Sequence, residues 1–365
     1  MNDLPRCLEQ PSTGTQWTLT RAWPRDAGHA LVELESPDGR WTAGQWFADR
    51  SALRRVAADT PRPAEAVPNA GVLLQPGGAD RRLRSLSRLL ATRRAELIVH
   101  RPERRAVLRT GDGAAPTYLK LVRRSRAAAL ITAASRAAPA ARSAFIIPAV
   151  LRADLADGAV EWAALPGRAL LQLGADELVA PDQLAGAWWR AGCAIAALGG
   201  GGTDGLPLRD AASEAETTSR WLRRAAALGL LPPVDATQVL APLRSGRPGP
   251  TGLVHGDLHD KQVLIPALGP VGLIDVDTLA AGELALDVAN LLTHVELRVA
   301  QGLLSAPRAA LAREAFLSGL DPDSRTLARI PAYAAAVRLR LAAVYACRPR
   351  WAAVSRRLLS ELCCV

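Results

Sequence analysis

Residues 255–277 read HGDLHDKQVLIPALGPVGLIDVD, and this stretch carries the strongest fold signal in the chain. An acid, Asp257, follows a short apolar run and lies in a polar segment, and a carboxamide, Gln262, comes five residues later. Two short apolar runs, VLI and VGLI, flank a turn rich in proline and glycine, and the second run leads directly to Asp275. This layout predicts a loop, a strand, a turn and a second strand that ends at an acid.

Acids and a carboxamide in this order are typical of phosphoryl-transfer centres. In such centres one carboxylate accepts the proton of the attacking hydroxyl, while a carboxamide oxygen and a second carboxylate hold magnesium. The general pattern is H-R-D-x-x-x-x-N followed by an Asp at a strand end, and His255, Asp257, Gln262 and Asp275 match it here. We expect Asp257 to be the catalytic base, and Gln262 and Asp275 to be metal ligands. Asp277, which projects to the same side if the strand continues, is a further candidate ligand.

The composition is that of an ordinary globular chain that can bury a core. Its 365 residues are 49% hydrophobic and 22% charged. The net charge of +10 comes almost entirely from arginine, because only two of the 45 basic residues, Lys120 and Lys261, are lysines. No nucleic-acid-binding motif accompanies this charge, and aromatic residues make up only 4%. We therefore interpret the arginines as dispersed and solvated, and expect no nucleic-acid partner.

Neither export nor a membrane is indicated by the sequence. The five cysteines have no C-x-x-C spacing and no histidine partner, which is typical of free thiols in a reducing compartment. The N-terminal MNDLPRCLEQ has no cationic segment followed by an apolar core, and no run of 18 apolar residues occurs. We expect a cytoplasmic protein without a membrane partner.

The order of predicted elements indicates an α+β fold with two lobes. Residues 1–95 contain alternating runs typical of a small β-hairpin, and a proline-rich segment within them, 60–71, is expected to be a linker. Residues 96–168 contain three predicted strands, a helix and two more strands, and end in a hinge segment. Residues 169–365 are mostly helical. We expect a β-containing N-terminal extension, a small β-rich N-lobe and a larger α-helical C-lobe.

One short internal similarity links the two β-rich parts. Residues 44–56 and 119–130 both read as a strand that runs into an arginine-rich helix start, with Gln45 where the second segment has Lys120. Because the match is so short, we treat it as coincidence.

These motifs resemble the aminoglycoside/choline-kinase-type phosphotransferase family, whose two-lobed fold is related to that of the protein kinases. The resemblance rests on HGD at 255–257, ID at 274–275 and GELALD at 282–287, and by element order it covers roughly residues 95–365. It implies a kinase that moves the γ-phosphate of ATP or GTP to a hydroxyl of a small molecule, with Mg²⁺ as cofactor. A net charge of +10 gives no sign of the acidic pocket that a polycationic aminoglycoside needs. A neutral or anionic acceptor therefore agrees with the charge of the chain at least as well as a polycationic one.

The resemblance implies how the nucleotide would bind. Lys120 would pair with the α- and β-phosphates. The segment between the first two strands has no glycine, so the guanidinium groups of Arg101 and Arg104 would bind phosphate in place of a backbone cradle, unless they are solvated turn arginines. Backbone groups around Leu165 and Gly167, in the hinge, would hold the adenine edge.

The resemblance also implies supporting residues. His255 and Asp287 would steady the catalytic loop through hydrogen bonds rather than touch substrate. Lys261 would neutralise the transferred phosphate or is an ordinary surface lysine.

Two departures from the family pattern leave a second interpretation open. The family lysine is usually steadied by a helix glutamate, but the helix expected after Lys120 has no acid. Lys120 would then be held by Thr132 or Ser135, by a distant acid such as Glu161, or by nothing until nucleotide binds. Gln262 replaces the family asparagine and is one methylene longer, and Mg²⁺ tolerates little geometric error. These departures favour a partner-dependent peptide kinase or a nucleotide-binding pseudokinase in a biosynthetic complex. The retained carboxylates and lysine favour an active small-molecule kinase.

Overall fold

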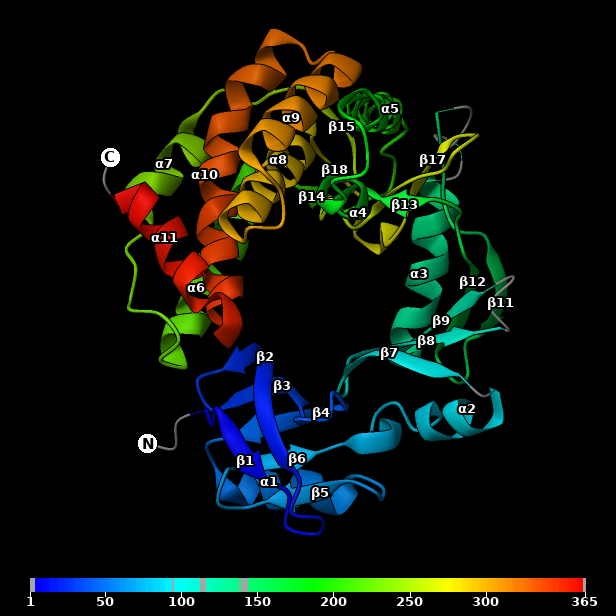
Figure 1. The fold of residues 1–365 in the computed structure, drawn as a ribbon, viewed down its shortest axis with the longest axis vertical. Helices are drawn as coiled ribbons and strands as arrows, with labels where there is room; N and C mark the ends of the chain where they lie inside the picture. The colour runs from blue at the N-terminus through cyan, green and yellow to red at the C-terminus, as the bar shows by residue number, and fades with distance from the viewer. Residues whose placement is uncertain (1–3, 94, 112–115, 138, 140–143, 364–365) are drawn as a thin grey trace.

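The computed structural model describes residues 4–93, 95–111, 116–137, 139 and 144–363. The α+β class is confirmed: the first half of the chain is rich in strands, and the second half is mostly helical (Figure 1). An N-terminal part, a second β-rich part and a helical lobe are arranged around the centre of the molecule (Figure 1). No helix in the described ranges is long and apolar enough to cross a bilayer.

The N-terminal part is a six-stranded sheet rather than a lone hairpin. Its order is β1-β2-β3-β4-β6-β5, and α1 (Arg50–Asp59) packs against it. The strands are β1 (Cys7–Glu9), β2 (Gln16–Asp26), β3 (His29–Glu35), β4 (Trp41–Phe47), β5 (Glu65–Val67) and β6 (Val72–Leu74). The predicted linker at 60–71 is therefore wrong, because it contains β5. The prolines that suggested a linker flank this strand, where no ladder hydrogen bond from their nitrogen is needed.

The second sheet is the small β-rich lobe. Its order is β11-β12-β9-β8-β7, and α2 (Leu86–Arg93) leads into it. The strands are β7 (Glu96–Arg101), β8 (Arg105–Thr110), β9 (Thr117–Val122), β11 (Val150–Asp154) and β12 (Ala159–Ala163), and α3 (Arg124–Ala137) follows β9. The first of the two strands expected after this helix is divided in the structure: β10 (Phe145–Ile146) leaves this sheet and pairs in parallel with β17 (Val271–Leu273). Only the later residues of that segment, in β11, pair within the small lobe.

The two sheets share one strand order. Three antiparallel strands, β2-β3-β4, are followed by α1 and by β5 and β6, and β6 lies next to β4. Likewise β7-β8-β9 are followed by α3 and by β11 and β12, and β12 lies next to β9. The segments 44–56 and 119–130 thus occupy equivalent places, as the end of the third strand and the helix after it. The sequence match between these two segments was expected to be a coincidence, but in the structure it coincides with a shared arrangement of strands and helix.

The helical lobe is built around one buried helix. Its helices are α4 (Leu170–Ala175), α5 (Pro181–Gly199), α6 (Ala211–Ala227), α7 (Thr237–Ser245), α8 (Leu284–Ala300), α9 (Ala306–Leu320), α10 (Ser324–Ala346) and α11 (Ala352–Cys363). Most residues of α8 are buried, and α10 packs along it. Helices α5 and α9 touch backbone to backbone, since a Cβ at Gly319 would lie 2.1 Å from the Trp189 carbonyl oxygen.

Two small sheets flank the predicted site. One has the order β10-β17-β16-β13, with β13 (Arg168–Ala169) and β16 (Val263–Ile265); the antiparallel pair β16–β17 confirms the strand–turn–strand prediction. The other has the order β14-β18-β15, with β14 (Leu208–Arg209), β15 (Thr251–Val254) and β18 (Ala280–Glu283).

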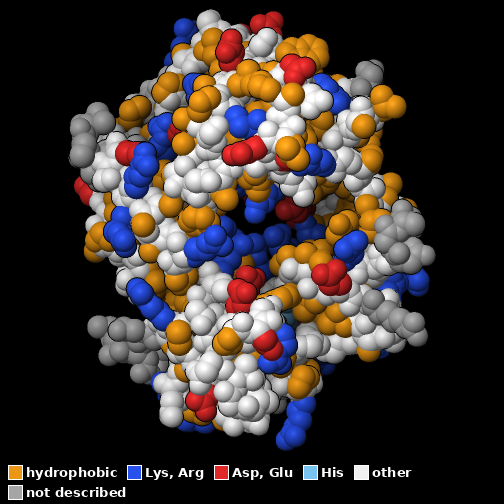
Figure 2. Space-filling model, in the orientation of Figure 1, with side chains coloured by type: hydrophobic (Ala, Val, Ile, Leu, Met, Phe, Trp, Pro, Cys, Tyr) orange, Lys and Arg blue, Asp and Glu red, His pale blue; other side chains and the backbone are white. Residues whose placement is uncertain are grey.

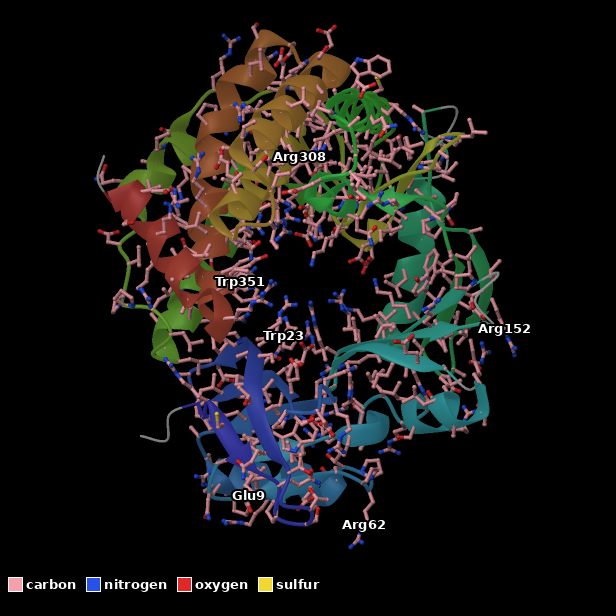
Figure 3. The ribbon with its side chains drawn as sticks, in the orientation of Figure 1. Glu9, Trp23, Arg62, Arg152, Arg308 and Trp351 are labelled. Atoms are coloured by element: carbon pink, nitrogen blue, oxygen red, sulfur yellow. The ribbon has the colours of Figure 1, made fainter. Side chains whose placement is uncertain are left out.

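The N-terminal sheet also touches the helical lobe. Strand β2 packs near α6 and near the short turn of helix at Pro349–Trp351, and the Ala22 N–H donates to the Cys347 carbonyl at 2.8 Å. Trp23 and Trp351 mark this junction in Figure 3. The N-terminal part therefore contacts both the small lobe and the helical lobe, so that the three parts form a ring in the view of Figure 1.

Candidate active site

The loop that follows β15 is held in position by hydrogen bonds to α8. Asp287, in the first turn of α8, is fully buried and accepts hydrogen bonds from the backbone N–H groups of His255 (2.5 Å) and Gly256 (2.9 Å). Burial raises the pKa of Asp287, and these donors and the His255 ring oppose that rise. Gly256 has φ +82, and a Cβ there would lie 2.4 Å from the Thr278 carbonyl oxygen. Glycine is therefore required at this position of the loop.

His255 connects the loop to the strand that leads to Asp275. Its Nε2–H donates to the Ile274 carbonyl at 2.9 Å, and its own carbonyl accepts from the Thr278 hydroxyl at 2.8 Å. Asp275 itself has φ 63, a left-handed conformation that is uncommon outside glycine. The loop and the acid after β17 are thus fixed relative to each other.

Asp257 is half-buried, and two residues that follow it in the loop are anchored. The Asn290 side-chain amide donates to the Leu258 carbonyl at 2.7 Å, and Asp260 pairs with Arg298 through two hydrogen bonds of 2.7 and 2.9 Å. Within the described residues no hydrogen bond or ion pair engages the Asp257 carboxylate. The loop around Asp257 is therefore anchored, and its carboxylate is available as a proton acceptor.

The Asp260–Arg298 pair is buried and was not found from the sequence. Both side chains are at most 5% exposed. Burial alone would lower the pKa of Arg298, but the hydrogen bonds and charge of Asp260 raise it. The sequence pointed to this pair only through Asp260, the second acid of HGDLHD. Its partner, Arg298, lies 38 residues away and could not be recognised from the motif.

Lys120 lies between two carboxylates. Its Nζ donates to Asp275 Oδ1 at 2.8 Å and to Asp277 Oδ2 at 2.7 Å. The expectation that an acid from elsewhere in the chain holds Lys120 is confirmed, but these acids are Asp275 and Asp277, and the named candidates Glu161, Thr132 and Ser135 are wrong. Glu161 pairs with Arg93 and accepts from Thr117 instead, and the hydroxyls of Thr132 and Ser135 donate to carbonyls of their own helix.

These two carboxylates can hold a cation, as their contact with the lysine ammonium shows. Burial would raise the pKa of Asp275, but Lys120 and its other neighbours lower it well below the usual range, whereas burial and the adjacent Asp275 raise the pKa of Asp277. Among the described residues no group of three or more His, Cys, Asp or Glu side chains forms a metal site. Mg²⁺ is commonly bound by one or two carboxylates plus substrate phosphates, and this pair suits that requirement.

Gln262 is buried at the end of the same loop. Its carboxamide oxygen accepts from the His259 N–H at 3.2 Å, and its backbone carbonyl accepts from Ile274 N–H at 3.0 Å. The side chain therefore helps to close the loop, and its oxygen keeps a second lone pair.

The hinge residues lie against the β16–β17 pair. Gly167 has φ +110, and a Cβ there would lie 2.5 Å from the Ile265 carbonyl carbon. Leu165 covers Gly272 on β17, since a Cβ on that glycine would lie 3.0 Å from Leu165 Cδ1. Strand β13, directly after the hinge, pairs with β16.

The β7–β8 turn places its arginines on different sides. Arg101 is close enough to Asp257 and Asp275 for their charges to act on it, and so is Arg105 to Asp275. Arg104 is exposed, and its charged neighbours are other arginines, Arg25 among them. The sequence therefore indicated Arg101 and Arg104, but the structure brings Arg101 and Arg105 to the carboxylates.

This turn is anchored to the N-terminal part through Glu103. The Glu103 carboxylate accepts from Arg81 at 2.7 Å and from Gln45 at 3.3 Å, and its backbone N–H donates to Asp80 at 2.7 Å. Its carbonyl accepts from Arg123 at 2.7 Å. Gln45, the equivalent of Lys120 in the sequence match, thus contacts the turn rather than a carboxylate pair.

The family model described as "Phosphotransferase enzyme family" matches residues 94–327. The chain belongs to this family. The match spans the second sheet, the catalytic loop and the first helices of the helical lobe, and it does not include the N-terminal sheet. No curated protein matches the chain significantly.

Solved structures similar to this phosphotransferase have low sequence identity. An aminoglycoside phosphotransferase from Streptomyces rimosus is 20% identical, with a TM-score of 0.50, over 70% of this chain and 97% of that one. A type I macrolide 2'-phosphotransferase is 18% identical, with a TM-score of 0.48, over 76% and 96%. A glucosamine kinase is 20% identical, with a TM-score of 0.44, over 96% and 95%. At these identities the first match shows a shared fold.

We expect Asp275→Asn to lower the kcat of this phosphotransferase by about hundredfold or more, because a bound metal supplies several kcal/mol of charge stabilisation. The measurement is nucleotide consumption, with nucleotide binding titrated with and without Mg²⁺. Asp277→Asn is the matched comparison, since it removes the other partner of Lys120. Equal or larger loss in Asp277→Asn would assign the main ligand role to Asp277.

Proposed function

We propose that this protein is a magnesium-dependent kinase that transfers the γ-phosphate of ATP or GTP to a hydroxyl of a small molecule. The observation that carries the proposal is the contact of Lys120 with Asp275 and Asp277 beside an unpaired, anchored Asp257. These are the charges that phosphoryl transfer uses: a proton acceptor, an ammonium for phosphate oxygens and carboxylates for a cation. They lie in the region that matches the family model.

The transfer itself balances without another reactant. Asp257 accepts the proton of the acceptor hydroxyl, and the acceptor oxygen forms a bond to the γ-phosphorus. The bond from that phosphorus to the bridging β-oxygen breaks, and a nucleoside diphosphate leaves. Lys120 and Arg101 stabilise the charge on the phosphate oxygens, since positive groups fixed before the reaction need no reorganisation during it.

Asp275 would hold Mg²⁺, with Asp277 and the carboxamide oxygen of Gln262 as its neighbours. When bound, the ion would neutralise charge on the phosphate groups. Lys120 would pair with the α- and β-phosphates. The adenine edge would meet the backbone around Leu165 and Gly167.

The acid-free helix after Lys120 does not require a pseudokinase. Two carboxylates already hold the lysine in position, and both come from the segment after β17. An active small-molecule kinase, working in the cytoplasm where nucleotide and Mg²⁺ are abundant, is therefore the function that we favour.

Nucleotide binding is the direct test. At a ligand concentration of 100 Kd, ATP or GTP with Mg²⁺ should stabilise the folded protein by about 2.7 kcal/mol, which raises Tm by several degrees. Thermal unfolding is measured with each nucleotide, with Mg²⁺ alone, and with nucleotide plus a chelator. Absence of a shift with both nucleotides in the presence of Mg²⁺ would contradict the proposal.

A further inference from the structure

Four arginines from all three parts of the molecule approach one another near the catalytic loop. Arg21 comes from β2, Arg101 and Arg105 from the β7–β8 hairpin, and Arg348 from the segment after α10. The charge of Arg348 acts on Arg21, and the charges of Arg21 and Arg105 act on Arg101. Figure 2 shows basic side chains around the hollow at the centre of the molecule. We refer to Arg21, Arg101, Arg105 and Arg348 as the arginine cluster.

The arginine cluster has no direct acidic partner. In the described part of the chain, no hydrogen bond or ion pair links any of the four guanidinium groups to a carboxylate. The buried Nε atoms of Arg101, Arg105 and Arg348 have no hydrogen-bond acceptor, and neither has Trp23 Nε1. Glu33, Asp257 and Asp275 act on the cluster only through their charges at longer range. Buried donors are nearly always satisfied in folded proteins, and an anion bound in the central hollow would give these donors an acceptor.

Aromatic rings fix the orientation of three of these arginines. Arg21 lies 4.4 Å and Arg101 4.9 Å from the centroid of a Trp23 ring, and Arg348 lies 4.2 Å from that of Tyr345. A stacked guanidinium is held flat while its N–H edge remains available. The Tyr345 hydroxyl accepts from Arg298 at 3.2 Å, which ties the stack to the catalytic loop.

The positive charges persist at neutral pH. Burial lowers the pKa of Arg101 to about 9, and repulsion from Arg105 and Arg21 contributes. Burial and the charge of Arg348 lower the pKa of Arg21 to about 10. Both values remain above neutrality, so the cluster gathers unneutralised positive charge that an anion would stabilise.

The arginine cluster extends from the β7–β8 hairpin to the helical lobe, and Arg21 and Arg101 both lie against Trp23. Arg101 and Arg105 belong to the hairpin beside the carboxylates proposed to hold Mg²⁺, so they suit the transferred group. Arg348 instead lies over the Tyr345 ring, whose hydroxyl accepts from Arg298, the partner of Asp260 in the catalytic loop, and Arg21 precedes Ala22, which donates to the Cys347 carbonyl. Transfer is roughly in line, with the acceptor opposite the leaving nucleotide and close to the base. Arg21 and Arg348 therefore belong on the acceptor side.

We propose that the acceptor carries an anionic group, a carboxylate or a phosphate, which Arg21 and Arg348 bind while Asp257 faces its hydroxyl. This proposal rests on the kinase function proposed above and narrows its substrate class. Guanidinium forks match the oxygens of both groups. The N-terminal sheet, which lies outside the family match, thereby contributes an acceptor-binding residue.

The test begins with anion binding to the full chain. The protein is saturated with Mg²⁺ and the β,γ-imido analogue of ATP, so that the γ-phosphate position is filled, and inorganic phosphate or acetate is titrated. We expect one of these anions to bind, and Arg21→Gln and Arg348→Gln to raise its Kd by about tenfold or more, as for loss of a charged hydrogen bond. Arg40→Gln, which changes an exposed arginine in the turn between β3 and β4, is the control and should leave Kd unchanged.

The second part of the test measures turnover of candidate acceptors. Matched hydroxyl compounds, a neutral hexose, its uronate and its phosphate ester, are compared for nucleotide consumption. We expect turnover of a charged form, with KM raised about tenfold or more by Arg348→Gln and less by Arg348→Lys, which retains the charge. The preferred form distinguishes a carboxylate from a phosphate. If Arg21→Gln fails to fold, the two Arg348 variants decide.

The outcomes separate this inference from the kinase proposal. Failure of the ATP analogue to bind would overturn the kinase function itself. Binding of the analogue without anion binding, anion binding that is insensitive to Arg21 and Arg348, or preferred turnover of the neutral hexose would overturn the anionic acceptor alone.

Discussion

Asp257→Asn lowers kcat by about 10²–10⁴-fold, the usual contribution of a general base, while nucleotide affinity stays within about twofold. The carboxylate has no partner among the described residues, so its removal breaks no hydrogen bond that holds the loop. Asparagine has nearly the same shape and cannot accept the proton of the acceptor hydroxyl. The loss should therefore fall on the chemical step and spare folding and nucleotide binding.

The measurement combines steady-state turnover with titration of nucleotide in the presence of Mg²⁺. Asp182→Asn, an exposed acid in the first turn of α5, is the matched control and should retain full activity. Turnover of Asp257→Asn within about tenfold of the parent would remove Asp257 from the role of base.

Asp260→Ala destabilises the protein by about 3–5 kcal/mol, because it leaves the guanidinium of Arg298 buried without its carboxylate. The urea midpoint of unfolding measures this loss. The double variant Asp260→Ala with Arg298→Met removes both charges and should recover part of it, since no unpaired ion remains. As a control, Glu361→Ala breaks the exposed Arg357–Glu361 pair and should cost less than about 1 kcal/mol.

The same variant tests how the catalytic loop is held. Asp260 lies three residues after Asp257, so its release should also lower kcat. A stability loss below about 1 kcal/mol would mean that Arg298 finds another partner or water after the change. Recovery of stability without recovery of turnover in the double variant would assign the ion pair a positioning role.

Local patterns predicted the local structure well. The helix expected after the third strand of the small lobe is present at 124–137, and the strands on either side of the turn in residues 263–274 pair as expected. Apolar spacing and turn residues specify such elements directly. The roles of Asp257 and Asp275 also came from a contiguous stretch. They remain predictions until the variants are measured.

Contacts between distant segments could not be predicted in the same way. The partners of Lys120 lie 155 and 157 residues away, and β10 pairs with a strand of the other lobe. Strand β5 was missed because three residues between prolines are too few to show the alternation of apolar and polar residues that is typical of a strand. It is recognised as a strand only by its pairing with β6. The role proposed for Arg21 depends on the hydrogen bond between Ala22 of β2 and Cys347. No local sequence pattern predicts this contact between distant segments.

The β7–β8 turn has a consequence for how nucleotide enters and leaves. In many kinases the corresponding loop is glycine-rich and can move as a small flap. Here Glu103, through its side chain, its N–H and its carbonyl, is bonded to Gln45, Asp80, Arg81 and Arg123. These bonds tie the turn to the N-terminal sheet as well as to its own lobe. In the kinase proposed above we therefore expect the turn to move only together with that sheet, and we expect Glu103→Ala to speed the release of nucleotide.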